Sequence, residues 1–115
     1  MLKMRMQIME QGGVISNKVA CFMNLVIDLM KERFPEWSQE KEEMFTTHLA
    51  MATERISKGD IVETMDETAW EDVKGCGGFP EAESFFAKMM EISPVDFPES
   101  EKRFILLHIC NMLEP

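Results

Sequence analysis

Apolar residues recur every three or four positions in four long stretches of the chain, which is the spacing of a helix that buries one face. Residues that start or stop helices lie at the ends of these stretches. Ser38, Pro80 and Pro98 favour starts, whereas Pro35 and Gly59 favour ends. The four long helices predicted in this way cover residues 17–34, 38–58, 80–92 and 98–113.

The segment between the second and third of these helices has a less regular pattern. Residues 64–70 are predicted to form a short helix, and the glycine-rich residues 74–78 a loop. Strand signals are weak, because there is no tyrosine and no Asn-Gly or Asp-Gly turn between alternating segments. We therefore predict an all-α, compact bundle of about five helices at residues 16–115, preceded by an N-terminal extension at residues 1–15.

Composition and charge narrow the classes of function. The 115 residues carry a formal net charge of −9, which repels nucleic-acid phosphates and anionic lipids, so we expect no direct nucleic-acid binding and no membrane binding. No apolar run is long enough for a signal peptide or a membrane span. Three widely spaced cysteines without a Cys-x-x-Cys pair are typical of a reducing compartment. We expect a cytoplasmic protein.

The last predicted helix is apolar nearly all round, and three polar residues interrupt it. Glu101 and His108 are seven residues apart and share one stripe, with Asn111 three positions further on. Burying such groups without partners would cost about 1–3 kcal/mol each. They are therefore expected to face a polar cleft, one another or the surface.

The second predicted helix repeats this arrangement, because His48 and Arg55 are also seven residues apart. A phosphoryl group on the imidazole of His48 would be attracted to a nearby guanidinium. A histidine on a mostly apolar helix is, however, usually a structural residue with satisfied hydrogen bonds. Helical geometry alone leaves the structural and the functional interpretation equally open for this pair of histidines.

Two motifs resemble those of a known family, the PTS regulation domain. Residues 48–55, His-Leu-Ala-Met-Ala-Thr-Glu-Arg, are similar to its first-histidine motif. Residues 98–111, a proline-led helix with Glu101, His108 and Asn111 in register, are similar to its second. The motifs occur in the expected order, and the resemblance extends over roughly residues 16–113.

The resemblance implies a dimeric bundle of helices that regulates bacterial sugar operons. In this family, the phosphocarrier HPr or a sugar-specific EIIB component phosphorylates histidines, and the added charge shifts the dimer between active and inactive forms. By position, His48 and His108 would be the phosphoacceptors, and Arg55, Glu101 and Asn111 would orient them. The chain would be no enzyme and would need no cofactor or metal.

Two departures from the family pattern affect this interpretation. Thr47 replaces the acidic residue that usually precedes the first histidine, which makes His108 the stronger candidate acceptor. One copy of the domain is present without an effector module, so the chain is expected to act through a partner such as a transcriptional regulator.

Two alternatives stay open: a helical adaptor of the same fold without phosphoacceptor activity, and a metal-dependent or acid–base enzyme using His48, His108 and Glu101. The second is weaker because no metal-binding register is recognisable.

Overall fold

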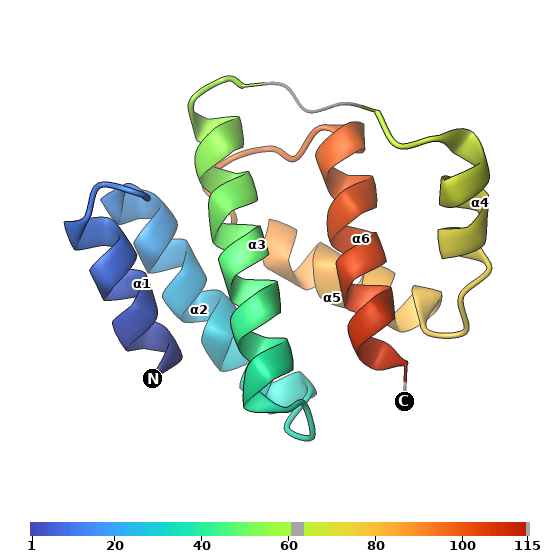
Figure 1. The fold of residues 1–115 in the computed structure, drawn as a ribbon, viewed down its shortest axis with the longest axis horizontal. Coiled ribbons are helices and arrows are strands. Elements are labelled where there is room, and N and C mark those ends of the chain that lie inside the picture. The colour runs from blue at the N-terminus through green and yellow to red at the C-terminus, as the bar shows by residue number, and fades with distance from the viewer. Residues whose placement is uncertain (61–63, 115) are drawn as a thin grey trace.

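The computed structural model describes residues 1–60 and 64–114 of the protein (Figure 1). Residues 61–63, which adjoin the predicted short helix, and residue 115, at the end of the predicted domain, lie outside the described residues. The described part forms six helices: α1 (Leu2–Gln11), α2 (Asn17–Arg33), α3 (Gln39–Ser57), α4 (Glu67–Lys74), α5 (Phe79–Met90) and α6 (Glu99–Leu113). The predicted all-α bundle is confirmed, with six helices in place of about five.

Local side-chain chemistry sets several helix ends. The hydroxyl of Ser38 accepts a hydrogen bond from the backbone N–H of Lys41 at 3.2 Å and caps α3, as the sequence predicts. Gly59 follows α3 with φ of +79°, a conformation that favours glycine. Asp66 caps α4 through the N–H groups of the next turn, so this helix begins at residue 67 and extends past residue 70, where we expected it to end.

The additional helix is α1, within the segment expected to be an N-terminal extension. Leu2 and Met6, one turn apart, are buried against the bundle, and this burial orders a segment that composition alone describes as a methionine-rich tail. Lys3 forms an ion pair with Asp28 of α2 at 2.8 Å. The segment is therefore a packed element of the fold.

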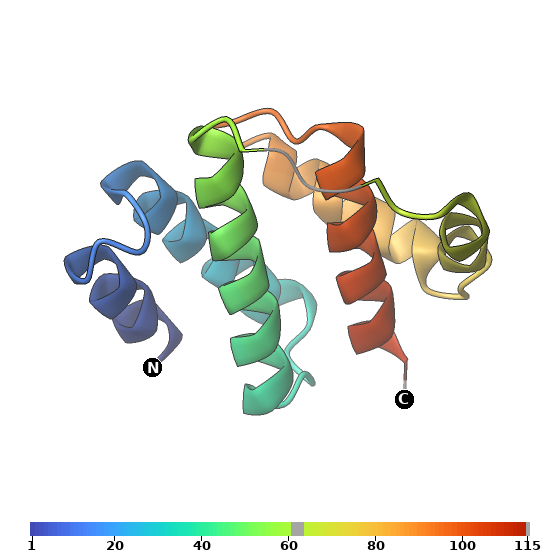
Figure 2. The same cartoon turned by 45° about the horizontal axis from the view of Figure 1, so that its top comes forward.

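The helices are arranged around two antiparallel pairs. α1 and α2 form a hairpin at one side, and α3 and α6 lie side by side in opposite directions at the centre (Figure 1). α5 passes behind α6, and α4 lies at the far edge beside α6 (Figure 2). This arrangement brings together α3 and α6, the two helices that carry the candidate site residues.

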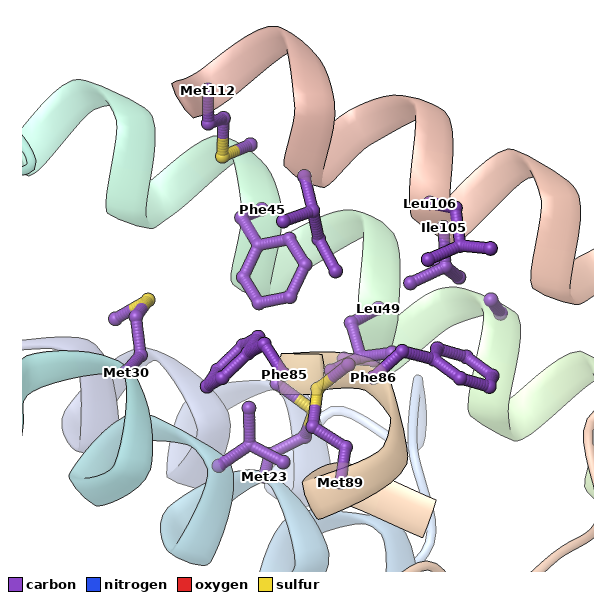
Figure 3. Close-up of a cluster of buried hydrophobic side chains, with 14 of the residues drawn as sticks. Met23, Met30, Phe45, Leu49, Phe85, Phe86, Met89, Ile105, Leu106 and Met112 are labelled. Carbon is purple, nitrogen blue, oxygen red and sulfur yellow. The ribbon is translucent and has the colours of Figure 1, made fainter. Parts of the chain in front are cut away.

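The core fills the space between α2, α3, α5 and α6 (Figure 3). Phe85 of α5 lies in its middle, with its ring edge-on to Phe34 at a centroid distance of 5.0 Å. Methionines fill the space around these rings; Met23, Met30 and Met89 are fully buried. The rear faces of α3 and α6 are thus fixed in the core, which leaves their front faces for the candidate site.

Contacts to Trp70 fix α4 at the edge of the bundle. The Arg103 guanidinium of α6 lies 4.8 Å from the Trp70 ring centroid and forms an ion pair with Glu67 at 3.0 Å. None of the six described helices is both long enough and apolar enough to cross a membrane.

Candidate functional site

The two histidines of the chain meet at the junction of α3 and α6. These helices run antiparallel (Figure 1), and His48 of α3 lies opposite His108 of α6. Their rings are stacked, with centroids 4.4 Å apart and planes 17° from parallel. The structure therefore joins, in one constellation, the two residues that the sequence analysis selected as candidate phosphoacceptors.

The two imidazoles differ in their surroundings. His48 is exposed, whereas His108 is half-buried. Burial, and secondly the proximity of His48, hold the pKa of His108 below its ordinary value. At neutral pH the His108 ring is therefore mainly uncharged, and a ring nitrogen keeps the lone pair that a nucleophile requires.

A second contact between the same helices lies two turns away. The Arg55 guanidinium donates two hydrogen bonds to the Glu101 carboxylate, from Nε and Nη2 to the two oxygens, each at 2.9 Å. Glu101 is only 2% exposed, and these hydrogen bonds raise the pKa of Arg55. The contact is a bidentate ion pair whose carboxylate is buried.

The stacked rings and the ion pair form two rungs between α3 and α6. Arg55 follows His48 by seven residues, and Glu101 precedes His108 by seven, so the rungs match only when the helices run antiparallel. From the sequence, each charged residue was expected to assist the histidine of its own helix. The structure instead pairs the two charged residues with each other.

The residue before the first histidine has an unexpected partner. Thr47, which stands where the family pattern has an acidic side chain, accepts a hydrogen bond at 2.8 Å from Nη2 of Arg5 in α1. The Nε atom of Arg5 is buried and has no hydrogen-bond partner. Sequence reasoning missed Arg5, because no periodicity or motif links α1 to a position 42 residues away.

Comparison with known proteins assigns the chain to a family. A family model described as the PRD domain matches residues 22–111, most of the chain. The chain belongs to the PRD family. This confirms the resemblance drawn from the two histidine motifs, and with it a PTS regulation domain concerned with carbohydrate-related regulation. The curated proteins and the solved structures yield no significant match.

The PRD match includes the residues of the two rungs but not the first helix. Both rungs lie within the matched residues, whereas α1 and its Arg5 lie before them. The sixth helix, by which the fold exceeds the predicted number, is thus an addition on the N-terminal side of the PRD match. It contributes a contact directly beside His48.

Asn111 lies apart from the two rungs. It is exposed on α6, one turn beyond His108, and lines a surface cavity together with Cys76, Cys110 and Glu114. Burial and hydrogen bonding with Cys76 raise the pKa of Cys110 to about 12, so its thiol is protonated at neutral pH. Within residues 1–60 and 64–114, no group of three or more His, Cys, Asp or Glu residues could hold a metal ion.

Apolar side chains flank the exposed histidine. Met44 and Met51 lie four residues before and three residues after His48, on the same stripe of α3, and about half of each side chain is exposed. A monomer leaves such a stripe in water, and methionine surfaces adapt to the shape of a bound protein. The His48 side of the PRD therefore presents an exposed imidazole within an apolar surface.

Proposed function

We propose that the protein is a PTS regulation domain that receives a phosphoryl group on the His48–His108 pair and acts by contact with another protein. The observation that carries this proposal is the stack of the two histidines at 4.4 Å, formed by the helices that hold the two PRD motifs. A structural histidine needs only a hydrogen-bond partner, whereas here two rings are presented together, one exposed and one uncharged at neutral pH.

The surroundings of His48 favour a protein as the phosphoryl donor. An approaching donor would contact Met44 and Met51 before or together with the imidazole. Phosphoryl carriers that hold the group on a histidine or cysteine, such as HPr or a sugar-specific EIIB component, have the chemistry that such a receiver needs. We infer a cytoplasmic role, because these donors act there.

The same features support a regulatory role in place of catalysis. A phosphoryl group adds about −1.5 to −2 charges, which is enough to change the partners of a surface. The chain already carries a net charge of −9, so its effector is expected to be a protein, such as a transcriptional regulator or a second copy of the chain, and not a nucleic acid.

Phosphorylation with purified components tests the proposal. The protein is incubated with phosphoenolpyruvate, enzyme I and HPr, and acid-labile phosphate is measured on the wild type, His48→Ala, His108→Ala and the double variant. Because the chain contains only two histidines, the double variant is the matched blank. We expect label on the wild type and none on the blank.

Two outcomes separate the alternatives. An unlabelled wild type, with HPr and then with EIIB components as donors, would remove the phosphoacceptor function and favour the adaptor interpretation. That interpretation is favoured by one observation, the Thr47 hydroxyl engaged by Arg5 where an acidic residue would stand. Measurement of the molecular size before and after labelling tests whether phosphorylation changes dimerisation. If neither the assembly nor the binding of partners changes, the phosphoryl group does not have the proposed regulatory effect.

A further inference from the structure

We propose that the His48–His108 pair accepts a single phosphoryl group per chain, because the ring modified first turns its neighbour into the cationic partner of the phosphate. The unmodified histidine thus holds the modification and does not serve as a second acceptor. This inference rests on the proposed function in one respect only, namely that both treat these imidazoles as acceptors.

The short distance between the rings disfavours a second phosphoryl group. With ring centroids 4.4 Å apart, phosphoryl groups on both rings would lie close together. Two groups of about −1.5 charge at a separation of about 6 Å repel in water strongly enough to disfavour the doubly modified form about tenfold. The half-buried position of His108 reduces screening by water and increases this factor.

A proton on the remaining ring also opposes a second transfer. A ring nitrogen must be unprotonated to form a bond to phosphorus, and His108 satisfies this while His48 carries no phosphate, since burial and His48 lower its pKa. A phosphate on the neighbouring ring has the opposite influence, because a nearby negative charge favours the imidazolium. The second ring then loses its free lone pair and gains a donor for the phosphate oxygens.

The charges in register with the pair offer little compensation for a second phosphoryl group. Arg55 on α3 and Glu101 on α6 are each seven residues from the histidine of their own helix and neutralise one another at 2.9 Å. Arg5 of α1 keeps its positive charge, but it donates its hydrogen bond to the Thr47 hydroxyl and not to either imidazole. The imidazolium of the unmodified ring is therefore the cation placed to balance the first phosphoryl group.

The exposure of the rings sets an order. His48 is exposed and His108 half-buried, so a donor meets His48 first. Substitution of His48 removes this competition and leaves His108 neutral and more open. Each single variant should therefore accept a phosphoryl group, even though the wild type does not accept two.

Phosphoramidate is a suitable probe, because this small donor needs no docking surface. In the transfer, the unprotonated ring nitrogen forms a bond to phosphorus as the P–N bond of phosphoramidate breaks. The leaving amine departs as ammonia and takes the proton that the acceptor ring gives up. Intact mass at neutral pH then counts phosphoryl groups on the wild type, His48→Asn and His108→Asn.

The fraction of each single variant that becomes phosphorylated gives the expectation for two independent sites. Their product is the fraction of wild type that should carry two groups if the rings do not interact. We expect the doubly modified fraction to be at least about tenfold below that product. A doubly modified fraction equal to the product would overturn the proposal.

Nitrogen-15 spectra of the singly modified protein at pH 8 provide a second measurement. We expect the ring that carries no phosphoryl group to be protonated, whereas in the protein before modification the His108 ring is neutral at this pH. A neutral second ring would overturn the role of counter-ion, even if steric exclusion kept the count at one.

A parallel incubation with phosphorylated HPr distinguishes this proposal from the proposed function. One group from phosphoramidate and none from HPr or an EIIB component would remove the proposed function and leave the exclusion intact. Two groups from either donor would remove the exclusion and leave the phosphoacceptor function intact. No group from any donor would remove both.

Discussion

Separate substitution of the two partners of the Arg55–Glu101 ion pair should have unequal effects on stability. In Arg55→Met, a carboxylate that is 2% exposed loses its cation, and breaking a buried pair in this way destabilises the fold by about 3–5 kcal/mol. In Glu101→Gln, the guanidinium that remains has 36% of its side-chain surface in water and keeps one acceptor. That loss amounts to about 1–2 kcal/mol.

Urea unfolding, followed by the fluorescence of Trp37 and Trp70, measures both values. For a chain of this length, each kcal/mol corresponds to about 4 °C in melting temperature, so the two variants should differ by at least about 4 °C.

Two controls show whether the difference comes from burial. Asp28→Asn removes an ion pair in which both side chains are more than half exposed, and should change stability by less than about 1 kcal/mol. The double variant Arg55→Met/Glu101→Leu removes both charges and should recover most of the stability lost in Arg55→Met. If Arg55→Met were no more destabilised than Glu101→Gln, the buried carboxylate would not be the decisive group.

Three further predictions concern other parts of the bundle. The folded-state pKa of His108 lies below its unfolded value near 6.5, so the free energy of unfolding falls as the pH drops from that value towards the folded pKa. His108→Gln should lack this part of the pH dependence. Urea titrations between pH 7.5 and 5.5 measure it, and an unchanged slope in the variant would contradict the prediction. Iodoacetamide at pH 8 should alkylate exposed Cys21 at least about tenfold faster than buried Cys110, whose pKa is about 12, as mapped by peptide mass; equal rates would show that Cys110 is accessible. Gly78→Ala should destabilise by about 1 kcal/mol, since its Cβ would lie 3.0 Å from a leucine side chain at the end of α6, whereas Gly77→Ala meets nothing within 4 Å and should be nearly neutral in thermal unfolding.

The sequence predicts the long helices well because their limits depend on local chemistry. Ser38 caps α3 from within one turn, and Gly59 ends it through its own backbone conformation. Helix α1 was not predicted, since only Leu2 and Met6 of that segment are buried, and two positions do not make a periodic stripe. Its order depends on the surface of α2 and α3, which the local pattern does not reveal.

The candidate site was likewise predicted in part from local pattern, and the rest of it depends on the tertiary fold. Periodicity places His48 and Arg55 on one stripe of α3, and Glu101 and His108 on one stripe of α6, and these placements hold in the fold. Which stripe faces which, and in what direction, is decided by the packing of the core behind both helices. The sequence therefore selected the four residues but not the ion pair between Arg55 and Glu101.

The two rungs between α3 and α6 also depend on the same register of one helix against the other. A slide of α6 along α3 by one turn, about 5.4 Å, would separate the imidazoles and break both hydrogen bonds of Arg55 at once. Neither contact can adjust alone, because each is fixed to the other by seven residues of rigid helix on both sides. Any event that shifts one rung is thereby carried mechanically to the other, two turns away.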